Sequence, residues 1–466
     1  MAIETQLGEA DTRRKRNAAF DRDLTKGSII GNLWTLTWPS VVSSTIMMLG
    51  PTIDMIWVGS LGSASIAGVG VAGMAAMVLG SARMGLSTGT RALLARAIGA
   101  GDEQQANHVA QQAFVISTVF SILMAAIGIF LAEPILALLG VEPDVVREGS
   151  AYMRIMFAGS VTMSFGMMAQ GIMQASGDAI TPMKVGIGVR IFHVILCPFL
   201  IFGWWIFPYM GVSGAAATNV ISHGIGGIIM LWILFSGHTR LRLTMRNFRF
   251  DGAMIWRIVK IGVPSSITGM ERSLANLVLM VLVVPFGTAA VAAHSLVERI
   301  DMFVNMPAFG LGQAAGVLAG QNLGAGHPDR AEKTAWTAAG LFTCMTVLAS
   351  VAIWFWAEYT VRVFNSEPEI VATTAAFLRI NIISYLVFGV VVVLMNALTG
   401  VGDTMTPMLT TLITMWLVQV PMAFVLPKVT TLGVYGVRWA IVTAIVMRAI
   451  IYTVYFRKGR WKLKEV

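Results

Sequence analysis

The sequence predicts an all-α integral membrane protein with twelve transmembrane helices in two six-helix lobes. Three observations support this fold class: the composition, the spacing of the apolar segments and a repeat of short motifs. Of the 466 residues, 56% are hydrophobic and only 12% are charged. A soluble globular chain carries about 25% charged residues. The composition therefore indicates a protein that lies within a lipid bilayer.

Twelve stretches are long and apolar enough to cross a membrane, which takes about 20 mostly apolar residues. The first six are expected at 31–59, 64–92, 108–132, 149–174, 182–207 and 212–236. The second six are expected at 253–285, 289–318, 332–357, 370–398, 405–427 and 433–456.

The basic residues predict the orientation of these spans. Lys and Arg are concentrated in the N-terminal arm, in the link between the sixth and seventh spans and in the C-terminal tail, whereas the loops 60–63 and 208–211 contain none. The positive-inside rule places both termini and the link in the cytoplasm. An even number of spans is then required, in agreement with twelve.

Short motifs recur at a constant offset of 225 residues. The pairs are Pro39 and Pro264, the Gly-Ala-Gly at 99 and 324, the Gly-Asp at 177 and 402, and the Thr-Pro-Met at 181 and 406. Each half has six spans and enters from the same side, so a pseudo-twofold axis along the membrane normal should relate them. The expected division is an N-terminal arm 1–27, an N-lobe 28–236, a cytoplasmic link 237–252, a C-lobe 253–456 and a basic tail 457–466.

One carboxylate, Asp54, lies within the first span, and the residue at the repeat offset is Leu279. Ionised carboxylates inside a bilayer are costly and usually mark an ion or proton pathway. Pro51 shortly precedes the acid, and a proline can bend a helix. We therefore expect Asp54 to be a coupling residue and Pro51 a hinge. The alternative is an acid that is simply paired with a nearby cation.

The order of the motifs resembles the MATE (multidrug and toxic compound extrusion) family. The likeness is carried by Trp38-Pro39, Asp54-Met-Ile-Trp-Val-Gly59, Gln174-Ala-Ser-Gly-Asp178, Gly262-Val-Pro264 and Gly320-Gln-Asn-Leu-Gly-Ala-Gly326. The resemblance implies a secondary antiporter that exports amphipathic, often cationic organic compounds by rocking-lobe alternating access. Protons or sodium ions would drive it.

Further expectations accompany this reading. The protein should be a multi-pass protein of the bacterial cytoplasmic (inner) membrane and a monomer, with the lipid bilayer and a small-molecule drug as its partners and no nucleic acid. No Walker motif is present, so no ATP use is expected. We expect no enzymatic activity, no cofactor and no bound metal.

The fifth span departs from the family pattern. His193 and Cys197 stand where DinF-type members carry an asparagine and an aspartate. Sodium prefers oxygen ligands, whereas a histidine can exchange a proton near neutral pH, so protons are favoured and sodium is the alternative. His193 is a candidate coupling residue or a hydrogen-bonding core residue. Arg190, one turn earlier, could pair with an acid, lower proton affinity or hold helices together.

The second half carries further candidates. Glu271, close to the acid of NorM-type members, and Glu298 are candidate coupling residues. Arg299, Asp301 and Tyr385 are candidates for a substrate-contacting or supporting polar network. The sequence leaves open which of the two glutamates lines a cavity.

Two other functions remain open. Arg190, Arg272 and Arg299 are compatible with a lipid-linked oligosaccharide flippase of the same superfamily, which would need a basic cavity for phosphates. A channel or a non-transporting scaffold is the third possibility, and neither can move a substrate uphill.

Overall fold

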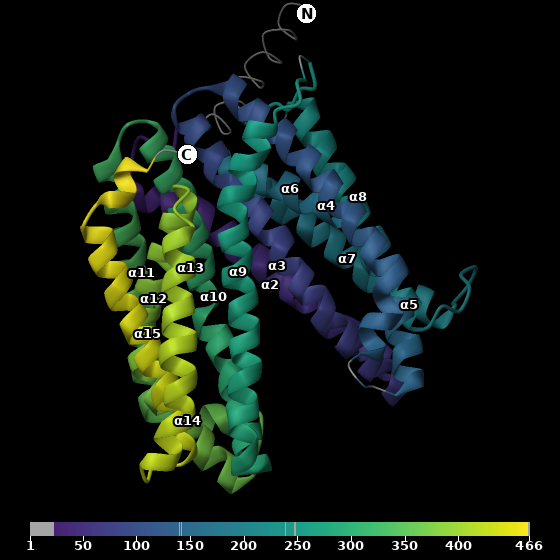
Figure 1. The fold of residues 1–466 in the computed structure, drawn as a ribbon, viewed down its shortest axis with the longest axis vertical. Helices are drawn as coiled ribbons and strands as arrows, with labels where there is room; N and C mark the ends of the chain where they lie inside the picture. The colour runs from purple at the N-terminus through teal and green to yellow at the C-terminus, as the bar shows by residue number, and fades with distance from the viewer. Residues whose placement is uncertain (1–22, 139, 141, 238, 247, 465–466) are drawn as a thin grey trace, which may run out of the picture. The chain divides into compact units, whose positions relative to one another are not determined.

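The computed structural model describes residues 23–464, apart from 139, 141, 238 and 247, and within this range the secondary structure is entirely helical (Figure 1). The first half contains α2 (Ile29–Gly59), α3 (Ser63–Gly99), α4 (Glu103–Ala137), α5 (Pro143–Ala158), α6 (Ser160–Ala175), α7 (Ile180–Phe202) and α8 (Val212–Ser236). The second half contains α9 (Gly252–Val283), η1 (Val284–Phe286), α10 (Thr288–Gly324), α11 (Pro328–Arg362), α12 (Pro368–Gly400), α13 (Met405–Leu412), η2 (Ile413–Gln419), α14 (Val420–Val429), α15 (Val434–Arg457) and η3 (Arg460–Leu463).

The helices confirm an all-α membrane protein. Among the described residues, nine helical segments are long and apolar enough to span a bilayer, and the bent pair α5 and α6 makes a tenth. The helices α2 and α3, with 31 and 37 residues, occupy the two remaining predicted positions. Most of the predicted N-terminal arm, residues 1–22, lies outside the described residues.

One predicted span is not a single helix. The stretch expected at 149–174 is broken between α5 and α6, which meet at an angle of 50°. Gly159 lies at the break, where a Cβ atom would be 2.3 Å from Val220 of α8. Ser160 Oγ donates to the carbonyl of Ser121 on α4 (2.9 Å), and Ser121 Oγ donates to the carbonyl of Ser160 (3.4 Å). These contacts stabilise the bend, and periodicity alone could not reveal them.

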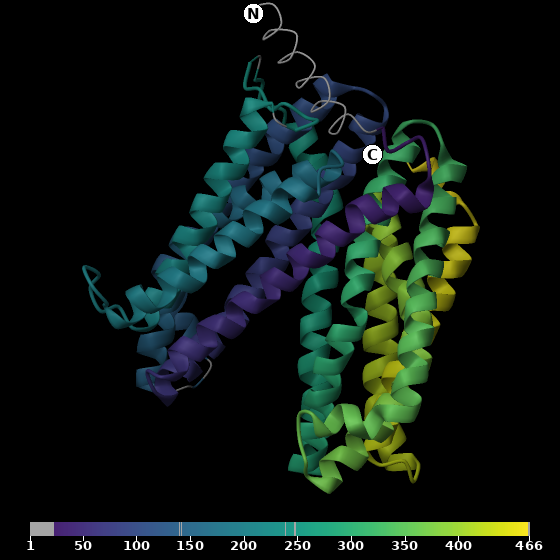
Figure 2. The same ribbon diagram turned by 180° about the vertical axis from the view of Figure 1, so that it is seen from behind.

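The chain divides into two compact units. Unit 1 comprises the described residues up to 76, residues 93–255 and 324–327, and unit 2 comprises 77–92, 256–323 and 328–464. In unit 1, α2, the purple helix in Figure 2, packs against α7, and α7 packs against α8. In unit 2, α12 packs against both α11 and α15. The lobe boundaries expected from the sequence stay a prediction.

Glycines explain why the segment 77–92 of α3 belongs to unit 2. A Cβ atom on Gly89 would lie 2.4 Å from the carbonyl oxygen of Ile258, and one on Gly85 would lie 2.4 Å from that of Gly262. Ser266 Oγ also donates to the carbonyl of Ala82 (3.3 Å). Small residues allow helix backbones to approach closely in membranes, so α3 and α9 pack here almost backbone to backbone.

The internal repeat is visible in the backbone of each unit. Gly177 and Gly402 both have positive φ angles, +99° and +92°. The following residues, Asp178 and Asp403, donate their N–H to the carbonyls of Met173 and Leu398. Each aspartate also accepts a hydrogen bond from the N–H three residues later. The Gly-Asp motif therefore builds the same helix-ending turn in both halves.

The link between the halves is held against α4. Asn107 and Gln111 donate side-chain hydrogen bonds to the carbonyl of Thr244, at 3.1 and 2.7 Å. Asp251 accepts hydrogen bonds from the first N–H groups of α9 and lies 3.0 Å from His108 Nε2. The hydrogen bond with His108 holds the pKa of the Asp251 carboxyl below its ordinary value.

The basic tail also packs onto the protein. Trp461 of η3 is fully buried and stacks on Phe456, with ring centroids 4.5 Å apart. Lys462 Nζ lies 2.7 Å from Glu332 of α11, and the acidic partners raise the pKa of this lysine. Lys464 Nζ lies 2.9 Å from the buried Asp403. The tail thus fastens the ends of several helices of unit 2.

Candidate functional site

The acid of the first span, Asp54, lies in a polar cluster inside unit 1. Asp54 is 5% exposed, and its Oδ1 lies 2.7 Å from His193 Nε2. Asn219 Nδ2 donates to Oδ2 at 2.7 Å, and the Cys197 thiol donates to Oδ1 at 3.7 Å. Three helices therefore meet at one buried carboxylate: α2, α7 and α8.

The sequence explains why α7 presents two partners. His193 and Cys197 are four residues apart, so they lie on the same helix face. Both side chains are buried, and both contact the same carboxylate oxygen. The pairing of Asp54 with His193 brings together two of the predicted coupling residues.

Sequence reasoning missed Asn219. Its amide donates both to Asp54 and to the carbonyl of Ala215 (3.2 Å), one turn earlier on α8. This second hydrogen bond orients the amide toward the acid. A polar Thr-Asn pair within an apolar span was the available signal, but nothing local indicated which way the amide points.

Arg190 occupies space left by a glycine of α2. A Cβ atom on Gly50 would lie 2.2 Å from Arg190 Nη1. Among the described residues, no arginine lies within 4.0 Å of the Asp54 carboxylate. The basic residue within that distance is His193. The guanidinium therefore acts on Asp54 through the electric field and not through an ion pair. Pro51 lies within α2, but its side chain is outside the description.

The chemistry of this cluster suits a proton better than a hard cation. The donor atoms of Asp54, His193 and Cys197 all lie within 4.8 Å of one another. Besides the carboxylate they are a nitrogen and a sulfur, whereas hard cations prefer a shell of oxygen ligands. The short contact between Asp54 and His193 instead joins two groups that can exchange a proton.

Glu271 lies on α9 in unit 2 and is 6% exposed. Neither of its carboxylate oxygens has a hydrogen-bond partner within the described part of the chain. Arg448 of α15 is the basic residue that acts on it electrostatically, and the Arg448 Nε donates to Thr414 Oγ1 at 3.0 Å. Thr414 belongs to the π-helix η2, an element often found at functional sites. The coupling role of Glu271 stays a prediction.

A second polar cluster in unit 2 contains two of the predicted network residues. The Tyr385 hydroxyl and the Asn381 amide, both on α12, donate to the Asp301 carboxylate of α10. Glu298, one turn before Asp301, lies 3.5 Å from His294 Nε2. Asn381 and His294 were not anticipated, and Arg299 is exposed. The roles predicted for Glu298 and Arg299 stay predictions.

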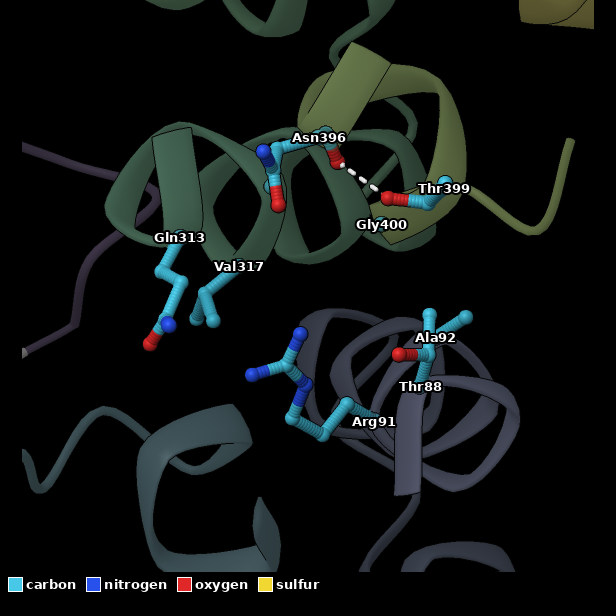
Figure 3. Close-up of a pocket in the computed structure, with 9 residues that line it drawn as sticks. Thr88, Arg91, Ala92, Gln313, Val317, Asn396, Thr399 and Gly400 are labelled. Atoms are coloured by element: carbon cyan, nitrogen blue, oxygen red, sulfur yellow. Dashed lines mark hydrogen bonds between the residues drawn. The ribbon is translucent and has the colours of Figure 1, made fainter. Parts of the chain in front are cut away.

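A small polar pocket lies in unit 2 (Figure 3). Thr88 and Arg91 of α3 line it together with Gln313 of α10 and Asn396 of α12. The Thr399 hydroxyl donates to the carbonyl of Asn396 (3.0 Å) at its edge. The sequence did not single out Thr88, Arg91, Gln313 or Asn396.

Comparison with known proteins places this architecture in a family. The MatE family model matches residues 39–199 and 264–425, which together make up more than half of the chain. A crystal structure described as "MATE in the bent conformation" superimposes with a TM-score of 0.87 at 23% identity, covering 94% of this chain and 96% of the other.

Curated relatives agree with this match over most of their length. "Probable multidrug resistance protein YoeA" of Bacillus subtilis is 26% identical, over 92% of this chain and 93% of the relative. "Probable multidrug resistance protein NorM" of Thermotoga maritima is 25% identical, over 92% of this chain and 93% of the relative. The chain therefore belongs to the MATE family of transporters and is not an enzyme.

Proposed function

We propose that this MATE-family protein is a proton-coupled antiporter that exports amphipathic, often cationic organic compounds. The observation that carries the proposal is the buried contact of 2.7 Å between Asp54 and His193. The substrate class is supported by relatives that are named multidrug resistance proteins. The choice of the proton as the coupling ion is supported by the nitrogen and sulfur groups that surround the Asp54 carboxylate.

The proposed mechanism begins with a proton arriving from outside. When Asp54 is protonated, it loses the charge that holds His193 and Asn219, and the contacts of α2 with α7 and α8 weaken. The first span bends near Pro51, the affinity for the bound cation falls, and the substrate leaves. The lobes then rock inward, the proton is released, and a new substrate binds. Coupling requires that proton and substrate prefer different states.

The test is dye transport in proteoliposomes, with ethidium as the probe. A proton gradient or a sodium gradient is imposed on the wild-type protein, on Asp54→Asn and on His193→Asn. The matched control is Glu133→Gln, which removes an exposed ion pair with Arg154 in the same unit. We expect proton-driven transport in the wild type and a loss of about tenfold or more in Asp54→Asn, within the usual range of coupling energies.

The two variants separate the roles of the pair. In His193→Asn the new amide can still donate a hydrogen bond to Asp54 but cannot exchange a proton, so proton-driven transport should slow. The control should transport at close to the wild-type rate. Transport driven by sodium alone would overturn the proposal. No transport with either gradient would favour the flippase alternative.

A further inference from the structure

We propose that Asp54, His193 and Cys197 form a binding site for a transition-metal cation of the Zn²⁺ class, and that the bound ion blocks transport. The binding stands on the geometry of the cluster. The block rests on the proposed function, in which the contacts of α2 with α7 weaken. Asp54 lies 139 positions before His193 in the chain, so no short spacing indicates a metal site, and the sequence alone predicts no bound metal.

The first argument is the arrangement of the three donor atoms. Each residue offers one atom, and these atoms all lie within 4.8 Å of one another. The Cys197 Sγ lies 3.7 Å from Asp54 Oδ1, and the His193 Nε2 lies 2.7 Å from the same oxygen. Around a tetrahedral Zn²⁺ with bonds of about 2.0–2.3 Å, neighbouring ligand atoms are roughly 3.3–3.8 Å apart. The sulfur and the oxygen already have this separation, and the imidazole has to withdraw by only about half an ångström.

The second argument is how the helices present these groups. His193 and Cys197 are four residues apart on α7, and both are buried. Residues at this spacing share a helix face, and it is also the spacing of the two histidines that bind zinc in H-E-x-x-H helices. The third ligand, Asp54, is buried on α2. A bound ion therefore joins α2 to α7 directly, whereas the proposed bend of the first span needs these contacts to weaken.

The third argument is the chemistry and charge of the donors. An imidazole nitrogen, a thiolate and a carboxylate are the ligand types that Zn²⁺ takes from proteins, whereas Ca²⁺ and Mg²⁺ require oxygen atoms. The Cys197 thiol gives up its proton when the ion binds, because the thiolate is the ligand form. The thiolate and the Asp54 carboxylate then carry two negative charges, which cancel the two positive charges of the ion. A neutral complex avoids the cost of a net charge inside a membrane.

Asn219 lies on the more open side of the cluster. It is partly buried, whereas the three proposed ligands are buried, and its amide donates to Asp54 Oδ2. An ion therefore approaches the cluster from this side. If the amide turns over, its oxygen can be the fourth ligand, because an amide offers both a donor and an acceptor. Otherwise a water molecule completes the tetrahedron, as in zinc sites with three protein ligands.

The binding test uses purified protein in detergent, with any affinity tag removed and metals stripped by a chelator. Calorimetric titration with Zn²⁺ measures affinity and stoichiometry. Co²⁺ is the coloured substitute, whose bond to a thiolate produces a charge-transfer absorption band. We expect one ion per chain and this band in the wild type. The matched control is Cys344→Ser, which removes the other, exposed cysteine and should keep both signals.

Cys197→Ser should lose the absorption band and bind Zn²⁺ about tenfold or more weakly, since even residues that only orient a ligand contribute 10–100-fold to affinity. A band retained in Cys197→Ser, or no binding by the wild type, would overturn the site. His193→Asn gives a second test if Cys197→Ser does not fold. It should weaken Zn²⁺ binding by a similar factor, and an unchanged affinity would contradict the proposal.

The blocking test measures ethidium transport driven by a proton gradient in proteoliposomes, with and without Zn²⁺. At ten times the dissociation constant, about one chain in ten stays free of the ion. Transport by the wild type and by Cys344→Ser should therefore fall about tenfold and recover when a chelator is added. For Cys197→Ser, the rate with Zn²⁺ should stay close to the rate of the same variant without it.

The outcomes separate the two proposals. Zn²⁺ binding that leaves wild-type transport unchanged would overturn the block. Absence of proton-driven transport before Zn²⁺ is added, in protein that still binds the ion, would instead overturn the proposed function and support the metal site.

Discussion

Asp54 is a buried carboxylate that is stabilised inside the protein by its hydrogen-bond partners. Both of its oxygens have hydrogen-bond partners, and the partner His193 is itself able to take up a proton. A buried polar group that is fully hydrogen-bonded is stable, whereas loss of one partner is costly. Under the proposed function, a change in the protonation of Asp54 alters the contacts among three helices.

Gly50 offers a test of the role of Arg190 at this site. In Gly50→Ala the new Cβ would overlap the end of the Arg190 side chain, which is flexible enough to move away. We expect little change in thermal stability. We expect proton-driven ethidium transport to slow, because the guanidinium is displaced from its place beside α2. Gly59→Ala is the control on the same helix, since nothing lies within 4 Å of its Cβ position. Equal transport rates for the two variants would contradict a supporting role of Arg190.

At the scale of helices, close backbone contact recurs wherever small residues face each other. A Cβ atom on Gly400 at the end of α12 would lie 2.1 Å from the carbonyl oxygen of Gly316 on α10. A Cβ atom on Gly316 would lie 2.6 Å from the carbonyl oxygen of Asn396. Lipid tails are as apolar as leucine side chains, so the hydrophobic effect does not drive helices together within a bilayer. Close packing of this kind therefore contributes much of the free energy of helix association.

Gly400→Ala should therefore destabilise the protein. The neighbouring atoms belong to the backbone and cannot rotate away, and overpacking of this kind costs about 1–3 kcal/mol. The measurement is thermal unfolding of the purified protein in detergent. Gly340→Ala on α11 is the control, because nothing lies within 4 Å of its Cβ position. Its midpoint should stay the same or rise slightly, since alanine favours helix by up to about 1 kcal/mol over glycine. Equal unfolding midpoints for Gly400→Ala and Gly340→Ala would show that the backbone contact between α12 and α10 does not contribute to stability.

At the scale of the whole molecule, the proposed coupling requires that the link and the tail lie on a defined side of the membrane. Asn107 and Gln111 of α4 hold the link by its backbone, and the tail is anchored by Trp461. The positive-inside rule assigns both segments to the cytoplasm. A proton pathway has a direction only if this assignment is correct.

Cysteine labelling in intact bacterial cells tests the orientation. In a background with Cys344→Ser and Cys197 retained as a buried thiol, Tyr209→Cys should react with a membrane-impermeant maleimide added outside. Arg246→Cys, in the link, should react only after the cells are permeabilised. Both side chains are exposed in the protein, so a lack of reaction reports the side of the membrane. The reverse pattern would invert the proposed direction of proton flow.

The sequence by itself determined the helical membrane fold, the repeat and the position of Asp54. These features are local: a span is recognised by its length and apolarity, and the Gly-Asp turns by their spacing. The resemblance to the MATE family, confirmed by comparison, followed from the order of the same motifs. Asp54 stood out because a single carboxylate in an apolar stretch is rare.

Only the tertiary structure decided which residues meet. Asn219 contacts Asp54 across 165 positions, and Tyr385 contacts Asp301 across 84. A span that is apolar on all sides carries little information about which face turns toward its neighbours, because lipid and protein interior are similarly apolar. The partners of a buried charge are therefore set by how the helices rotate and pack, and this depends on contacts between segments far apart in the chain.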